Sequence, residues 1–221
     1  MKILAVDTAL GACSAAVTDG EEILAHIFEP MARGHAEALA PMVERAMRDA
    51  RLAFCALDRL AVTTGPGTFT GQRVGLAFMR GLRLSLNKPL CGVTTLEAMA
   101  AAAMDITDVN FAATLHDAKR GEFYFQMSSR AAAISPPQIG TLEEASRMIS
   151  ANTRKIALAG TGANPASSLL AARGVEAIVT GIAEPDALWV ARLARRAPLP
   201  DEPVRPLYLR APDAKPPGPR P

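Results

Sequence analysis

The chain has 221 residues, which is enough for one large domain or for two lobes of about 100 residues each. Hydrophobic residues make up 49% and charged residues 21%, and the formal net charge is only +2, which excludes a disordered chain and a general polyanion binder. No apolar run is long enough to span a membrane, and three widely spaced cysteines exclude a complete disulfide framework, so we expect a cytoplasmic protein without a membrane partner.

The first half of the chain predicts a meander of three strands, followed by helices that alternate with strands. Short apolar runs bounded by turn residues indicate the strands, and apolar residues at i, i+3 and i+4 indicate the helices. The strands are expected over residues 3–6, 12–17, 23–28, 60–64 and 90–93, and the helices over 35–51, 71–86 and 95–104.

The second half repeats this order in a weakened form. Strands are expected over residues 111–115, 122–127, 131–135 and 156–159, and helices over 142–149, 166–173 and 186–196. The recurrence predicts two related α/β lobes, residues 1–104 and 105–200. A proline-rich segment, residues 201–221, follows; we expect residues 206–215 to dock through apolar side chains and the last residues to be disordered.

The glycine-rich stretch GPGTFTG (65–71) connects a predicted strand to a predicted helix. Thr70 is a candidate N-cap, and free N–H groups at such a helix start can hold an anion. The stretch is not a Walker A loop, because Gln72 follows Gly71 where that motif requires lysine. A structural turn and an anion site therefore both remain open.

The helix after this stretch contains Gly71, Gly75 and Gly81, each costing about 1 kcal/mol relative to alanine. Such a cost predicts close approach of another backbone. Val74, Phe78 and Leu82 form an apolar stripe suited to the core. A second face could meet a partner or simply be solvated; it carries Arg73, Leu76, Arg80 and Arg83.

A few polar residues are candidates for nucleotide chemistry. Asp7 ends the first strand beside Thr8, and could hold the metal of a nucleotide or only cap the turn. Gly160 and Gly162 follow a later strand. His35 and Glu37 are too few ligands for zinc, and the chain has no HExxH pattern, so we expect no protein-bound metal.

Several stretches, in this order along the chain, resemble the bacterial TsaB (YeaZ) family: ILAVDTALGACSAAV (3–17), RGHAEALAP (33–41), GPGTFTGQRVG (65–75), HDAKRGEFYF (116–125) and PLYLRAPDAK (206–215). The resemblance implies an α/β, actin/Hsp70-like (ASKHA) fold with two related lobes, each built from a mixed sheet and helices. This sequence departs from the family pattern at Ala36, where serine is usual, and at Gln72, where an apolar residue is usual.

The resemblance also implies a function. Members are non-catalytic scaffold and activator subunits of the complex that adds threonylcarbamoyl to the adenine beside the anticodon of tRNAs reading ANN codons. The implied partners are a TsaD-like catalytic subunit, a TsaE-like ATPase and a second copy of the chain, with tRNA contacted indirectly. No cofactor is expected on this chain alone, because ATP, magnesium and the partner's metal belong to the complex.

The resemblance places the partner interface on the first two long helices and implies no catalytic or metal-binding residue. The interface residues are His35, Glu37, Leu39, Met42, Gly71, Arg73, Gly75, Leu76, Arg80 and Arg83. A vestigial nucleotide or anion site would comprise Asp7, Thr8, Gly65, Gly67, Thr68, Gly160 and Gly162.

Two other functions compete with this one. A stand-alone actin-fold ATPase or small-molecule kinase would use Asp7 and the GPGTFTG loop to hold ATP and magnesium. Direct tRNA binding by the basic, proline-rich C-terminal segment is the third alternative.

Overall fold

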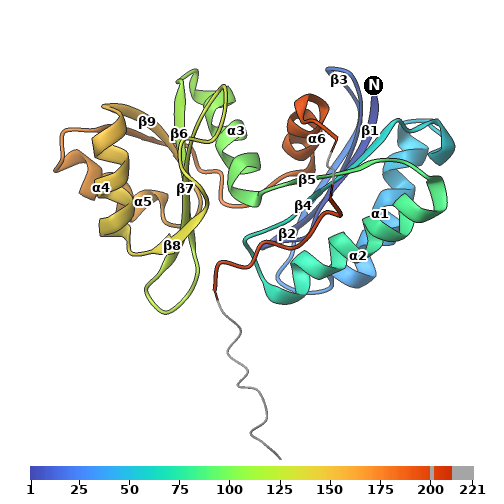
Figure 1. Ribbon diagram of the computed structural model, residues 1–221, viewed down its shortest axis with the longest axis horizontal. Coiled ribbons are helices and arrows are strands. Elements are labelled where there is room, and N and C mark those ends of the chain that lie inside the picture. The colour runs from blue at the N-terminus through green and yellow to red at the C-terminus, as the bar shows by residue number, and fades with distance from the viewer. Residues whose placement is uncertain (200–201, 211–221) are drawn as a thin grey trace, which may run out of the picture.

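The computed structural model describes residues 1–199 and 202–210, which form two lobes, each with a five-stranded sheet (Figure 1). In chain order the elements are β1 (Lys2–Asp7), β2 (Ala12–Asp19), β3 (Glu22–Pro30), α1 (His35–Asp49), a 3₁₀ turn (Phe54–Ala56), β4 (Arg59–Thr63), α2 (Phe69–Leu86), β5 (Leu90–Val93), α3 (Thr95–Thr107), β6 (Phe111–Asp117), β7 (Phe123–Ser129), β8 (Gln138–Gly140), α4 (Leu142–Asn152), β9 (Lys155–Ala159), α5 (Ala163–Ala171), β10 (Glu176–Val179) and α6 (Ala187–Arg196).

The sheet of the first lobe has the order β3-β2-β1-β4-β5. The first three strands form the predicted antiparallel meander, and β4 and β5 run parallel to β1. Side chains alternate along β1: Leu4 and Val6 pack with α1 and α2, whereas Ile3 and Ala5 pack with α6. Both faces of the sheet are therefore covered, as Figure 1 shows.

The second lobe repeats this arrangement, because its order β8-β7-β6-β9-β10 reproduces the first sheet strand for strand. Again two antiparallel pairings are followed by two parallel ones. Helices α4 and α5 contact one face of the sheet, and α3 covers the other. The internal duplication that the sequence indicated is therefore confirmed.

Two strand predictions differ from the structure. Residues 131–135, predicted as a strand, form turns and one isolated bridge between Ser128 and Ala133. The third antiparallel strand is β8 instead, three residues long, and the edge strand β10 was not predicted. Both are short and only partly buried, so they carry little hydrophobic pattern.

The packing also differs from a division of the chain at residue 105. Helix α6 returns to the first lobe, where Val190 and Ala194 lie against β1 and β4. Helix α3 instead packs on the second sheet through Met99 and Ala103. Alanine-rich helices fit either sheet, so their sequence does not show which one they cover.

Residues 204–208 pack on the first lobe, so the predicted docking is seen for the described part of 206–215; residues 211–221 lie outside the described residues. Within the described part of the chain, no helix combines the length and apolar character needed to cross a membrane.

Candidate functional site

Asp7 ends β1 and is completely buried. Its Oδ1 accepts hydrogen bonds from Thr63 Oγ1 at 2.5 Å and from the Ala9 amide at 3.2 Å. Its Oδ2 has no hydrogen-bond partner among the described residues. The pKa of Asp7 is raised to about 7, chiefly by burial and to a smaller extent by Glu184 and Asp186, while the two hydrogen bonds lower it.

Close packing against Thr8 accounts for the glycines at positions 71 and 75 of α2. Its hydroxyl donates to the Gly71 carbonyl at 2.7 Å and accepts from the Gly75 amide at 3.0 Å. A Cβ on Gly71 would lie 2.2 Å from the Thr8 carbonyl oxygen, and one on Gly75 would lie 2.7 Å from Thr8 Oγ1. The predicted close approach of another backbone therefore exists, but it lies within this chain rather than at a partner interface.

The GPGTFTG loop packs onto the connection between β1 and β2. A Cβ on Gly67 would lie 2.3 Å from the Ala9 carbonyl oxygen. Thr68, not Thr70 as predicted, is the N-cap of α2 and accepts from the Gly71 amide. The amides of Thr68, Gly71 and Gln72 already donate within the loop or to Ala9, so they are not free for an anion.

Gly160 and Gly162 belong to the second lobe and face β6. The Gly160 amide donates to the Ile182 carbonyl at 2.7 Å, and the Gly162 amide donates to the Leu115 carbonyl at 2.8 Å. A Cβ on Gly160 would lie 2.1 Å from the Leu115 carbonyl oxygen. Like Gly71 and Gly75 of the first lobe, they serve close packing, and their own amides already donate within the chain.

The residues suggested for a vestigial nucleotide site thus divide into two groups. Asp7, Thr8, Gly65, Gly67 and Thr68 lie together in the first lobe. Gly160 and Gly162 lie in the second. Among residues 1–199 and 202–210, no group of three or more His, Cys, Asp or Glu side chains is arranged to hold a metal ion.

Several residues predicted for the partner interface instead lie in the core. Leu39, Met42 and Leu76 are at most 3% exposed and pack between the helices and the sheet. Gln72 is also buried, beneath Gly65, so this departure from the family pattern does not alter an outer surface. The prediction had placed the inward side chains of two amphipathic helices on the outer face.

The remaining predicted residues lie on or beside the outer face. Glu37 and Arg83 are exposed, whereas the His35 ring contacts the Leu10 carbonyl at 3.0 Å. Arg73 and Arg80 are also exposed, but they donate to Tyr208 and to the Val204 carbonyl of the C-terminal segment. These two arginines therefore already have partners within the chain.

Two exposed apolar residues of α2 were missed. Phe69 is 58% exposed and Leu84 is 79% exposed, at opposite ends of the helix. The exposed Ala77 and Gly81 lie between them on the same side. We call Phe69, Ala77, Gly81 and Leu84 the α2 outer stripe. Their spacing of three, four or eight residues marks one helix face, a signal that was present in the sequence.

Comparison with known proteins agrees with the sequence resemblance. Residues 22–179 match the family described as TsaD, tRNA N6-adenosine threonylcarbamoyltransferase. The Escherichia coli K12 protein TsaB, of tRNA threonylcarbamoyladenosine biosynthesis, is 37% identical over 125 residues, covering 57% of this chain and 54% of that protein. The chain spans about half the length of the curated relatives it matches first. An uncharacterized protein of Mycobacterium tuberculosis H37Rv is 32% identical over 216 residues, covering 97% of this chain and 94% of that protein.

Solved structures share the fold. A Pseudomonas aeruginosa protein with similarity to peptidase YEAZ superposes with a TM-score of 0.81 at 27% identity, covering 95% of this chain and 99% of that one. An ROK hexokinase from Thermus thermophilus gives 0.56 at 15% identity, covering 88% and 98%. The predicted actin-like fold is thus confirmed, and, by the family match, the relatives and the shared motifs, the chain belongs to the TsaB/YeaZ family.

Proposed function

We propose that this chain is a non-catalytic subunit of a complex that adds threonylcarbamoyl to adenine in tRNA. The observation that carries the proposal is the close packing of the GPGTFTG loop against Thr8 and Ala9 of this chain. Gly67 and Gly71 press against the Ala9 and Thr8 carbonyl oxygens, and the amides of Thr68, Gly71 and Gln72 already donate within the chain. A phosphate could use those three amides only by breaking the hydrogen bonds that hold the loop, which supports a scaffold role over a stand-alone ATPase or kinase.

The family match supports the substrate class. Its description names an N6-adenosine threonylcarbamoyltransferase, and the curated relatives are named for threonylcarbamoyladenosine biosynthesis. A TsaD-like catalytic subunit is therefore the proposed partner. A TsaE-like ATPase, a homodimer, indirect tRNA contact and a cytoplasmic location stay predictions, as does the absence of a cofactor bound by this chain alone.

The α2 outer stripe is the proposed contact with the partner. Large exposed apolar side chains at Phe69 and Leu84 flank small ones at Ala77 and Gly81. Small residues allow a partner helix to approach, and the flanking apolar side chains supply burial. Leu39, Met42 and Leu76 stabilise the helices from beneath and are not part of this contact.

Binding to the purified TsaD-like partner tests the contact. We expect Leu84→Glu to weaken the affinity at least tenfold, because a carboxylate would be buried without a partner. Ile106→Glu is the control, since Ile106 is 61% exposed but lies on α3. Calorimetry measures both; equal affinity for wild type and Leu84→Glu would remove the stripe from the interface.

A reconstituted modification assay tests the function. Omitting this chain should abolish or strongly reduce formation of threonylcarbamoyl-adenine, and adding it back should restore the product. Calorimetry of the isolated chain with Mg-ATP distinguishes the stand-alone ATPase or kinase: micromolar binding with turnover would favour that enzyme over the scaffold.

A further inference from the structure

Residues 204–208 are attached to the first lobe by several contacts. The Leu207 amide donates to the Thr64 carbonyl at 2.7 Å. Val204 packs against the first core, beside Gly92, where a Cβ would lie 2.7 Å from Val204 Cγ1. From α2, Arg73 Nε donates to Tyr208 Oη at 2.8 Å and Arg80 donates to the Val204 carbonyl. Side chain and backbone contacts together fix the segment on this lobe.

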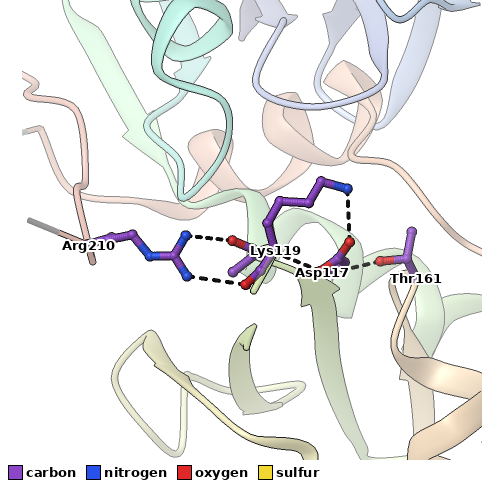
Figure 2. A network of polar contacts seen from close by, with 5 residues as sticks. Asp117, Lys119, Thr161 and Arg210 are labelled. Atoms are coloured by element: carbon purple, nitrogen blue, oxygen red, sulfur yellow. Dashed lines mark hydrogen bonds and ion pairs between the residues drawn. The ribbon is translucent and has the colours of Figure 1, made fainter. Parts of the chain in front are cut away.

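The same segment ends on the second lobe. Arg210 Nη1 donates to the Ala118 carbonyl at 2.8 Å, and its Nη2 donates to Glu122 Oε2 at 2.5 Å and to the Lys119 carbonyl at 3.4 Å. Figure 2 shows this guanidinium reaching the turn between β6 and β7. Planar arginine suits such a group of acceptors better than lysine does.

The turn that Arg210 contacts has an unusual backbone. Lys119, Arg120 and Gly121 have φ values of 67°, 62° and 77°, so three successive residues are left-handed. This conformation is unfavourable for lysine and arginine and persists where surrounding contacts hold it. Within the second lobe, Asp117 accepts from the Lys119 amide at 2.7 Å and from Lys119 Nζ at 2.9 Å. Arg210 adds contacts from the other lobe.

We propose that residues 202–210 are an inter-lobe strap, which holds the β6–β7 turn of the second lobe in place relative to α2 of the first. The chain otherwise crosses between the lobes after β5 and before α6 (Figure 1). The strap adds a non-covalent link that depends chiefly on one side chain, Arg210. Its removal should leave both cores intact and loosen their relative position.

The strap also borders the α2 outer stripe. The rings of Phe69 and Tyr208 stack with their centroids 6.0 Å apart, and the Arg73 guanidinium lies 3.4 Å from the Phe69 centroid. A partner that covers Phe69 would therefore touch the strap. The strap itself can be tested on this chain alone, without a partner protein.

Arg210→Ala in the full chain is the test variant, and Arg205→Ala is its matched control. Arg205 lies in the same segment, is exposed and has no hydrogen bond or ion pair with another described residue. By hydrogen-exchange mass spectrometry we expect the amides of residues 118–122 to exchange about tenfold faster in Arg210→Ala, with no change in β1. The control should match wild type.

Inter-lobe position is measured by pulsed electron resonance between spin labels on the exposed Cys55 and on Ser168→Cys of α5. Arg210→Ala should broaden the distance distribution, and Arg210→Lys should broaden it less, because lysine retains the charge without the planar fork. An unchanged distribution in Arg210→Ala would overturn the proposal, even if exchange in the turn increased. Unchanged exchange together with an unchanged distribution would overturn it as well.

Discussion

The two lobes have the same strand order but different environments at the end of their first strand. β1 ends at Asp7 and its counterpart β6 ends at Asp117. Burial raises the pKa of Asp7 to about 7. Hydrogen bonds from the Lys119 side chain and amide lower the pKa of the more exposed Asp117. The pKa values of these two topologically equivalent aspartates therefore shift in opposite directions. Burial dominates at Asp7, whereas hydrogen-bond donors close by dominate at Asp117.

The lobes also differ in the helix that follows the fourth strand. In the first lobe this helix is α2, with 18 residues, whereas α5 in the second lobe has nine. In both, a glycine near the start of this helix packs against a carbonyl oxygen of the first strand or of the residue after it: Gly71 against Thr8 and Gly160 against Leu115. The glycine contact is therefore common to both lobes. The first lobe differs from the second in its longer helix, α2, which carries an exposed apolar face.

Gly71→Ala should have the largest effect on stability, because the new Cβ would lie 2.2 Å from the Thr8 carbonyl oxygen. We expect the free energy of unfolding to fall by about 3 kcal/mol in urea denaturation. Gly81→Ala is the control: it has no atom within 4 Å of the added Cβ and should gain about 1 kcal/mol of helix propensity. If Gly71→Ala were as stable as the wild type, residue 71 could not lie this close to the Thr8 carbonyl oxygen.

Asp7→Asn should change the pH dependence of stability. The folded pKa of about 7 exceeds the ordinary value of 3.8. The folded state therefore binds this proton more tightly, and stability falls as pH rises between those two values. Relative to wild type, Asp7→Asn should gain about 2 to 3 kcal/mol between pH 5 and pH 8. Urea denaturation at both pH values measures this; a constant difference would show that Asp7 titrates normally.

Thr8→Val should be less severe, because it removes two buried hydrogen bonds while preserving shape. The expected loss is about 1 to 3 kcal/mol of unfolding free energy, since the Gly71 carbonyl and Gly75 amide lose this partner. In the second lobe, Thr161→Val removes an exposed contact with the Asp117 amide and should cost about 0.5 kcal/mol. Equal losses of unfolding free energy in Thr8→Val and Thr161→Val would contradict this difference between the buried and the exposed threonine.

Asp117→Asn should have the smallest effect, about 0.5 kcal/mol or less at neutral pH, because its pair with Lys119 is solvent-exposed. Its pH dependence has the opposite sign to that of Asp7. The pKa is lowered in the folded state, so the stabilisation is present above about pH 4 and disappears as pH falls through the folded pKa. Thermal unfolding at pH 3 and pH 7 measures it; a larger difference at pH 3 would contradict this assignment.

Much of the fold followed from local patterns. The meander, α1, α2 and the duplicated order were predicted from apolar spacing, and the two strands that differ, at 131–135 and β10, involve short segments without a clear pattern. The site was predicted less well. Leu39, Met42 and Leu76 are amphipathic-face residues, and periodicity identifies a shared face without showing whether it points to the core or to solvent.

The sequence by itself determined the family, the two-lobed α/β fold and the unusual glycines of α2, because motifs, periodicity and backbone cost are local properties. Only the tertiary structure decided what those glycines contact, which lobe α3 and α6 cover, and where the arginines bind. Thr8 is far from Gly75 in sequence, and Arg210 is far from Ala118, yet each pair is hydrogen-bonded. Such contacts depend on how the elements pack, which no single segment encodes.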